Sequence, residues 1–263
     1  MFEIHPRRSA DRGRVLMLAS VVDVAEAVIC REGGADVIDC KDPLQGALGA
    51  VPVATARAIV AAVGNDVPVS ATIGDHPCEE APIVAAAAEM AGAGVDYVKI
   101  GLAPGGDPTG VVRALGQLRS RLGKARLVGV LFADTDPDFA LVTEMAQAGF
   151  AGVVLDTANK SAGSLPDVMA PARLNDFVAA ARSGGLFCGL AGSLRARDIP
   201  ALVQLAPDLL GFRGALCREC KRTASLDREA VAGIRRAIPG CEEIGTERMI
   251  TKMSERLHEE HAQ

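Results

Sequence analysis

Short apolar runs alternate with alanine-rich segments along most of the chain. The runs are nearly continuous rather than alternating, which is typical of strands buried on both faces of a parallel sheet. They predict eight strands, over residues 15–19, 35–40, 67–73, 96–101, 126–132, 152–156, 186–191 and 209–212. The segments between them carry apolar residues at helical spacing, which predicts helices over 22–32, 53–63, 82–91, 109–121, 137–148, 172–183, 195–205 and 226–238.

Strand–helix units that follow one another without a linker predict a single closed (β/α)8 TIM barrel over residues 1–239. Glycines after several helices, such as Gly33-Gly34, supply the left-handed caps that turn the chain into the next strand. A doubly wound open sheet is the structural alternative. Such a sheet normally carries a glycine-rich phosphate loop after its first strand, and no G-x-G-x-x-G follows residues 15–19. The pattern therefore favours the barrel.

Residues 240–263 differ in character from the barrel. Met249, Ile250, Met253 and Leu257 have the spacing of one apolar helical face, with Glu and Arg between them. We expect a short C-terminal helical extension that closes the bottom of the barrel or contacts another subunit. We also expect the protein to form a homo-oligomer.

The composition of the 263-residue chain excludes several classes of protein. Hydrophobic residues make up 49% and charged residues 23%, which is typical of a globular domain. No apolar run approaches the roughly 18 residues that span a membrane. A net charge of −5 and an aromatic content of 3% argue against nucleic acid, which requires excess cations and stacking rings. We therefore expect neither a nucleic-acid nor a membrane partner.

The seven cysteines are scattered at long intervals, which makes a poor disulfide framework and fits a reducing cytoplasm. Cys217 and Cys220 form one C-x-x-C, a pattern found in redox centres and in half of a zinc site. A zinc site needs a second pair of ligands, and the four histidines offer none at suitable spacing. We interpret these cysteines as incidental thiols and expect neither a metal nor an organic cofactor.

Lysines and carboxylates interrupt the apolar runs where the predicted strands end. Asp39 and Lys41 end the second strand, Lys99 lies in the fourth, and Asp156 and Lys160 follow the sixth. Side chains alternate along a strand, so Asp39 and Lys41 point to the same side. A single Lys–Asp pair is equally well explained as a structural ion pair, but burying three lysines is costly without a function. Because barrels carry their active sites at strand ends, the cluster predicts an active site.

Such a cluster suits catalysis by a lysine amine. Neighbouring cations and poor solvation lower the pKa of a lysine toward neutrality. The neutral amine then condenses with a carbonyl group to an iminium, which acidifies the adjacent C–H, and a second lysine or an aspartate moves the proton. The sequence leaves open whether Lys41 or Lys160 acts first.

Loops that contain glycine are candidates for phosphate binding. Many barrels bind phosphate after their seventh and eighth strands, through backbone N–H groups and a helix N-terminus. The candidates are Gly192 and Ser193 after the seventh strand, Arg213 and Gly214 after the eighth and, more weakly, Gly46 and Gly49 after the second. Ser193 also suits the N-cap of the following helix, and the glycines after the second strand also suit a flexible turn.

A series of motifs, in this order, resembles the (5-formylfuran-3-yl)methyl phosphate synthases of methanofuran biosynthesis. The motifs are GGADVIDCKDP (33–43), GALGA (46–50), SATIGD (70–75), DYVKIGL (96–102), LDTANK (155–160), LAGSL (190–194) and FRGA (212–215). The resemblance covers roughly residues 15–238. It implies a (β/α)8 enzyme that joins two molecules of glyceraldehyde 3-phosphate into a phosphorylated furan aldehyde, with loss of phosphate and water.

The resemblance also implies roles for individual residues. Lys41 matches the Schiff-base lysine, and Ser193 and Gly214 lie in the phosphate loops. The matching acid–base and positioning groups are Asp39, Lys99, Asp156 and Lys160. The hypothesis is a cytoplasmic, aldolase-like lyase whose partner is a small triose phosphate. The alternatives are a barrel of aldolase, epimerase or decarboxylase type acting on another sugar phosphate, and a binding barrel without catalysis.

Overall fold

The structure, a computed structural model, describes residues 14–239. Parallel strands pair in sequence order and close into a barrel, in which the last strand pairs with the first. The strands are β1 (Leu16–Val21), β2 (Val37–Cys40), β3 (Val69–Thr72), β4 (Tyr97–Gly101), β5 (Arg126–Phe132), β6 (Gly152–Asp156), β7 (Phe187–Leu190) and β8 (Leu209–Phe212). The predicted (β/α)8 fold is confirmed. The predicted extension over residues 240–263 lies outside the described residues.

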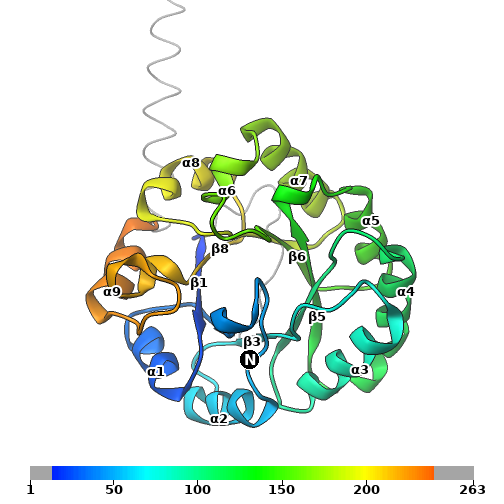
Figure 1. The fold of residues 1–263 in the computed structure, drawn as a ribbon, viewed down its shortest axis with the longest axis horizontal. Coiled ribbons are helices and arrows are strands. Elements are labelled where there is room, and N and C mark those ends of the chain that lie inside the picture. The colour runs from blue at the N-terminus through cyan, green and yellow to red at the C-terminus, as the bar shows by residue number, and fades with distance from the viewer. Residues whose placement is uncertain (1–13, 240–263) are drawn as a thin grey trace, which may run out of the picture.

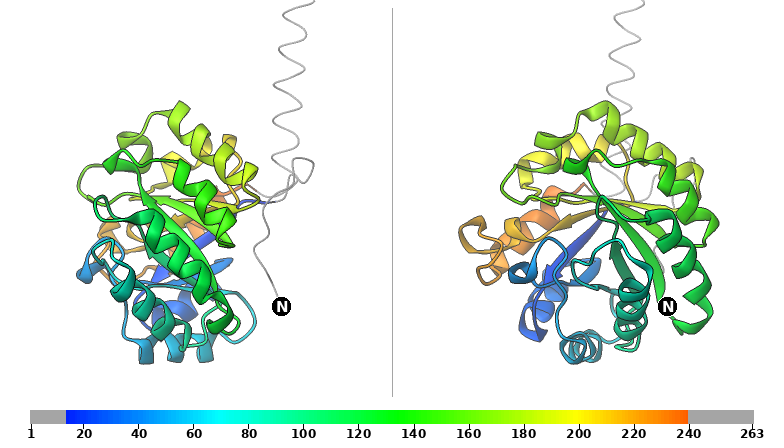
Figure 2. Two further views of the ribbon diagram at one scale, coloured as in Figure 1. Left: turned by 90° about the vertical axis from the view of Figure 1, so that its right-hand side faces the viewer. Right: turned by 45° about the vertical axis from the view of Figure 1, so that its right-hand side comes forward.

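The α-helices form a ring around the strands (Figure 1), and the turned views in Figure 2 show them on the outer face of the barrel. They are α1 (Val24–Glu32), α2 (Val53–Val63), α3 (Glu80–Ala91), α4 (Pro108–Leu118), α5 (Ala140–Gln147), α6 (Leu165–Val168), α7 (Pro171–Ser183), α8 (Ile199–Gln204) and α9 (Arg228–Ala237). Short 3-10 turns are η1 (Pro43–Gln45), η2 (Arg119–Arg121), η3 (Ala133–Thr135), η4 (Ala196–Asp198), η5 (Gly214–Leu216) and η6 (Arg218–Cys220). None of the helices between residues 14 and 239 has the length and apolar character needed to cross a bilayer.

Proline and aspartate account for the main differences from the predicted helices. The helix predicted over 195–205 is divided into η4 and α8, because Pro200 lacks an N–H and fits only the first turn of a helix. The helix predicted from residue 137 begins at Ala140, whose N–H donates to the Asp138 carboxylate at 2.9 Å. The helix predicted over 22–32 begins at Val24, and Asp23 caps it by accepting from the Glu26 N–H at 2.9 Å. The short helix α6 is not foreseen by the periodicity.

Three aspartates fix the register of the strands at the N-terminal end of the barrel. Each precedes a strand and accepts a backbone N–H near the start of an adjacent strand. Asp36 accepts from Met17 at 2.8 Å, Asp96 from Val69 at 2.9 Å and Asp208 from Cys188 at 2.7 Å. Each carboxylate satisfies a backbone donor that lies at the end of the ladder. These aspartates have a structural role at the N-terminal end of the barrel, and the candidate functional groups lie at the opposite, C-terminal end of the strands.

Apolar side chains fill the barrel interior and the layer between the strands and the helices. Inside the barrel, the rings of Tyr97 and Phe187 meet edge to face, with centroids 5.6 Å apart. Gly152 leaves the space that the Phe187 ring occupies, since a Cβ there would lie 2.4 Å from the ring. The close packing makes the lower barrel a solid core rather than a pore.

We predict that Gly152→Ala destabilises the protein by about 1–3 kcal/mol, because the added methyl group displaces the Phe187 ring. Gly233→Ala in α9 is the matched control, since its Cβ meets no atom within 4 Å. That substitution should leave stability unchanged or raise it by about 0.5–1 kcal/mol, because alanine favours helix over glycine. Urea denaturation measures both free energies of unfolding. Equal stability of the two variants would contradict the packing described for β6 and β7.

Candidate active site

Two lysines from different loops share one carboxylate at the C-terminal end of the barrel. Asp156 is the last residue of β6, Lys41 follows β2 directly, and Lys160 comes four residues after Asp156 in the loop after β6. The Lys41 Nζ lies 3.1 Å from Asp156 Oδ2, and the Lys160 Nζ lies 2.5 Å from Oδ1. Lys160 also donates to the Thr157 carbonyl oxygen. Each carboxylate oxygen thus receives one ammonium group.

A second ion pair lies below, on the floor of the site. The Lys99 Nζ of β4 lies 2.8 Å from Asp39 Oδ2 of β2. Ser20 on β1 and Ser70 on β3 donate their hydroxyl groups to the same carboxylate, at 2.9 and 2.6 Å. Asp39 is fully buried, and these three donors satisfy it there. The expectation that Asp39 and Lys41 point to the same side of β2 agrees with this geometry, in which Asp39 meets Lys99 and Lys41 meets Asp156.

Burial and mutual attraction set the protonation of the Asp156 cluster. Burial raises the pKa of Asp156, but the ammonium groups of Lys160 and Lys41 outweigh burial and hold that pKa well below its ordinary value. Burial lowers the pKa of Lys160 to about 8, a shift that Lys41 strengthens and Asp156 opposes. Asp156 therefore stays ionised, whereas Lys160 exchanges a proton close to neutral pH. A group with such a pKa suits proton transfer in either direction.

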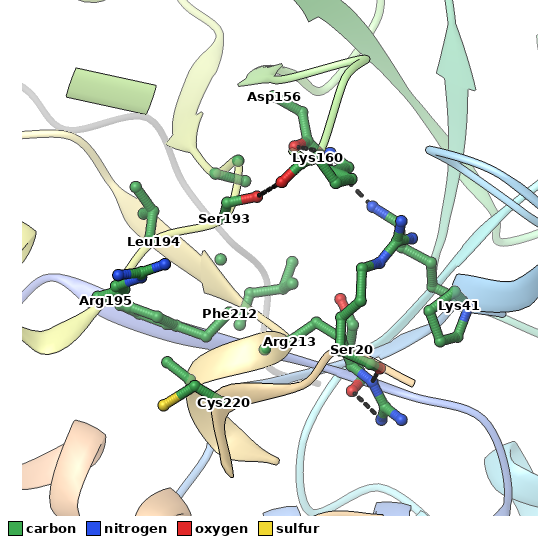
Figure 3. Close-up of a pocket in the computed structure, with 18 of the residues that line it drawn as sticks. Ser20, Lys41, Asp156, Lys160, Ser193, Leu194, Arg195, Phe212, Arg213 and Cys220 are labelled. Atoms are coloured by element: carbon green, nitrogen blue, oxygen red, sulfur yellow. Dashed lines mark hydrogen bonds and ion pairs between the residues drawn. The ribbon is translucent and has the colours of Figure 1, made fainter. Parts of the chain in front are cut away.

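The lysines line a cavity at the mouth of the barrel (Figure 3). Its volume is about 870 Å³, including the open mouth. In Figure 3, Lys160 and Ser193 lie side by side on one wall, joined by a hydrogen bond from the Ser193 hydroxyl to the Lys160 carbonyl at 3.3 Å. The cavity is lined by residues of several strands and of the loops that follow them, among them Ser20, Lys41, Lys99, Asp156, Lys160, Gly192, Ser193, Arg195, Arg213, Gly214, Cys220 and Arg222.

The loop after β7 has the backbone that a close approach requires. Gly192 has φ 106°, and a Cβ there would lie 2.8 Å from the Thr157 methyl carbon. Ser193 has φ 49°, a left-handed conformation that a residue other than glycine adopts at some energetic cost. Both residues line the cavity, as does Gly214 after β8. Their predicted contact with phosphate remains a prediction, and their location agrees with it.

Arg213 lines the cavity, but other groups of the protein accept the hydrogen bonds that its guanidinium donates. It forms an ion pair with Glu26 of α1 through both terminal nitrogens. It also donates to the backbone carbonyls of Ser20 at 3.2 Å, Arg222 at 2.8 Å and Ala224 at 3.2 Å. An arginine has five N–H donors, and these contacts use all of them. The geometry gives Arg213 a role in holding the loop after β8, and its predicted contact with phosphate is untested.

Gly46 and Gly49 shape the loop after β2 and are not among the residues that line the cavity. Asp75, after β3, accepts the N–H groups of Ala47 and Leu48 at 2.7 and 3.0 Å, and a Cβ on Gly46 would overlap its carboxylate. The Gly49 carbonyl accepts the Thr72 hydroxyl at 2.9 Å. The turn interpretation of these glycines agrees with the structure, and their predicted phosphate contact is untested.

Comparisons with known proteins assign this arrangement to a family. A family model described as 4-HFC-P synthase matches residues 17–235. The (5-formylfuran-3-yl)methyl phosphate synthase of Methanocaldococcus jannaschii is 36% identical over 230 residues, which cover 82% of this chain and 97% of that protein. The chain belongs to the 4-HFC-P synthase family. A Methylorubrum extorquens member, provisionally named as the same synthase, is 45% identical over 85% of this chain and 92% of its own length.

Solved structures of more distant proteins share the fold of this 4-HFC-P synthase family member. The 3-keto-L-gulonate-6-phosphate decarboxylase of Vibrio cholerae has a TM-score of 0.62 at 10% identity, covering 86% of this chain and 97% of its own. The 3-hexulose-6-phosphate synthase of Salmonella typhimurium has a TM-score of 0.60 at 15% identity, covering 84% of this chain and 98% of its own. At these identities the likeness shows a common barrel and no more.

The site of this family member also contains residues that the positions of charged residues at strand ends do not predict. The hydroxyl groups of Ser20 and Ser70 donate hydrogen bonds to Asp39 inside the barrel. A small polar residue within an apolar strand is the sequence signal for such a position. Asp134 accepts the N–H groups of Ala158 and Asn159, both at 2.7 Å, and so supports the loop that carries Lys160. Arg222 lines the cavity although it follows β8 by ten residues. No pattern in the sequence marks Arg222, because its place depends on how the loop folds back.

The C-x-x-C of the family member lies in the same loop. The Cys220 side chain is exposed and lines the cavity, whereas Cys217 is buried and burial raises the pKa of its thiol to about 11. Within residues 14–239, no group of three His, Cys, Asp or Glu side chains is arranged to hold a metal ion. The interpretation of these cysteines as incidental thiols remains a prediction.

We predict opposite shifts of the Lys160 pKa in two variants. Asp156→Asn removes an attracting negative charge and lowers that pKa further below about 8, whereas Lys41→Gln removes a repelling cation and raises it. Competitive labelling with acetic anhydride at a series of pH values, read by peptide mass spectrometry, gives the pKa of Lys160 in each protein. Circular dichroism checks that the variants fold. Shifts in the same direction in both variants would contradict the shared-carboxylate geometry.

Proposed function

We propose that the protein joins two molecules of glyceraldehyde 3-phosphate into (5-formylfuran-3-yl)methyl phosphate, for a methanofuran-type cofactor, through a Schiff base on Lys41. The observation that carries the proposal is that Lys41 and Lys160 share the Asp156 carboxylate in the wall of a cavity. The Lys160 amine, whose pKa is lowered, lies next to the Lys41 amine, and a pair of amines of this kind suits iminium catalysis. The names of the relatives supply the product. In this reaction two triose phosphates give one furan product, one phosphate and two water molecules.

In the proposed reaction, the Lys41 amine attacks the carbonyl carbon of one triose phosphate and water leaves. The Lys160 amine, when neutral, accepts a proton from the carbon next to the resulting iminium. The enamine formed in this way expels its own phosphate, and the carbon that carried this phosphate becomes the nucleophile. That carbon bonds the central carbonyl carbon of the second triose phosphate, in its ketone form. Ring closure then loses two water molecules, and hydrolysis of the iminium releases the aldehyde and returns the Lys41 amine. Asp156 holds both amines in place throughout, since it bonds each of them.

Lys99 has a separate place in the proposed reaction. Asp39 fixes its amine on the cavity floor, where the amine polarises a carbonyl or phosphate oxygen of the substrate. The reaction as a whole is that of an aldolase-like lyase. We also propose that it takes place in the cytoplasm, which the free thiols of Cys30, Cys40, Cys78, Cys188, Cys217 and Cys220 support.

We predict that borohydride, added with glyceraldehyde 3-phosphate, attaches substrate mass to the peptide that contains Lys41. Lys41→Arg should abolish the ultraviolet-absorbing furan aldehyde while the protein stays folded, because arginine keeps the charge but is not a neutral amine nucleophile. Lys124→Arg is the matched control: Lys124 pairs with Asp96 at 2.9 Å, at the opposite end of the barrel, and its variant should retain activity. Mass spectrometry identifies both the labelled peptide and the product.

Two results would change the proposal. Labelling of the Lys160 peptide instead would move the nucleophile to that residue. Turnover by a protein that borohydride leaves unmodified would exclude the imine, and a decarboxylase- or epimerase-like reaction through a carbanion would replace it.

We predict that the rate of furan formation rises with pH through about 8, because Lys160 accepts a proton only after losing its own. Lys160→Arg should lower kcat by about 100-fold or more, since general base catalysis typically contributes about 10²–10⁴-fold. The residual activity of that variant should lack the rise near pH 8. Initial rates over a pH series, with saturating substrate, test this. A rise of the same midpoint in the variant would assign the ionisation to another group.

A further inference from the structure

Arg222 places a positive charge at the cavity mouth without an ion pair among residues 14–239. It lies between η6 and α9 and lines the cavity. Its terminal nitrogen donates to the Gly46 carbonyl, in the loop after β2, at 2.8 Å. Within residues 14–239, no carboxylate lies within ion-pair distance of its guanidinium. The planar guanidinium fork matches the geometry of a phosphate group, so an arginine beside a cavity with donors that the protein leaves unused indicates a place for an anion.

The protein fixes the backbone of Arg222 from below. Arg213 donates its Nε–H to the Arg222 carbonyl at 2.8 Å and is itself anchored by Glu26. Gly214 leaves room for this turn, since a Cβ there would lie 3.3 Å from the Cys220 carbonyl oxygen. The buried Glu26–Arg213 pair therefore holds in position the loop that presents Arg222. A cation held in this way loses little further freedom when it binds a ligand.

Arg222 reaches the side of the mouth that faces β2, whereas the candidate phosphate loop with Gly192 and Ser193 follows β7. In the barrel order β8 and β1 separate β7 from β2, so the two places lie apart across the mouth. The amines of Lys41 and Lys160 line the same cavity. Arg222 also acts electrostatically on this cluster, since its charge contributes to the lowered pKa of Lys160. Burial lowers the pKa of Arg222 itself, and the carboxylates of Asp156, Asp75 and Asp42 oppose that shift.

We propose that Arg222 forms a second phosphate subsite, on the β2 side of the mouth. It binds the phosphate group of one triose phosphate, while the loops after β7 and β8 bind that of the other. This assignment rests on the proposed function, which requires two phosphorylated molecules in one cavity. One terminal N–H remains on Gly46, and the other donors of the guanidinium fork are available to phosphate oxygens. Two separate anchors hold the reacting carbons together over Lys41 and the negative phosphates apart.

The test uses glycerol 3-phosphate, which has the phosphate and chain length of the substrate but no carbonyl group to form an imine. Isothermal titration should find two molecules bound per wild-type chain and one per Arg222→Gln chain. Alternatively, the second site of the variant should weaken by about tenfold or more, the usual effect of losing a charged hydrogen bond. Glutamine is shorter than arginine, so this variant removes both the charge and the contact to the Gly46 carbonyl. Arg222→Lys keeps the charge and separates the two effects.

Arg218→Gln is the matched control, because Arg218 is an exposed arginine of the same loop that does not line the cavity. This variant should bind as the wild type does, and Arg222→Lys should recover part of the lost affinity. The assignment is overturned if Arg222→Gln binds glycerol 3-phosphate as the wild type does, or if both glutamine variants weaken binding equally.

Turnover supplies an independent readout. In Arg222→Gln the KM for glyceraldehyde 3-phosphate should rise by about tenfold or more, with a smaller change in kcat. If the wild type forms no furan from this substrate, the proposed function fails, but the titration with glycerol 3-phosphate still decides whether Arg222 binds phosphate.

Discussion

The carboxylate of Asp156 is the interaction on which the rest of the site depends. Two ammonium groups, those of Lys41 and Lys160, lie at the buried mouth of a barrel with this one carboxylate between them. Without it, two like charges in a poorly solvated place would repel each other and shed protons. With it, Lys160 keeps a pKa of about 8 rather than a lower one. The carboxylate thus places the amine between its charged and neutral forms near physiological pH.

The surrounding structure serves to hold that cluster still. The Asp134 carboxylate accepts two backbone N–H groups of the loop that carries Lys160. The Asp75 carboxylate accepts two backbone N–H groups of the loop after β2 in the same way. Below them, Asp39 and Lys99 form a second pair that hydroxyl groups from two further strands complete. At two places around the mouth, a carboxylate from one loop therefore orders an adjacent loop. Adjacent loops and the ion pairs of the site itself together hold the active site in position.

The fold and the main charged residues could be predicted because both follow from local patterns. Buried parallel strands need nearly continuous apolar runs, and a lysine or aspartate at the end of such a run has few places to go except the mouth of a barrel. The function of the glycine-rich loops is harder to predict from sequence, because glycine is as common in tight turns as in loops that bind a ligand. Gly46 and Gly49 shape a turn in the structure, whereas Gly192 lies at the cavity wall. Sequence alone does not separate these two uses.

Arg213 and Arg222, in the loop after β8, show most clearly which features follow from the sequence and which depend on the tertiary structure. Sequence by itself determined the barrel and predicted that Lys41, Lys99, Asp156 and Lys160 gather toward its C-terminal end, because the spacing of apolar residues follows from local structure. Only the tertiary structure decided that Arg213 lies on Glu26, far away in the sequence, and that Arg222 reaches the cavity. The physical reason is that an arginine's partner depends on which distant carboxylates and carbonyls the closed barrel brings within reach of its guanidinium.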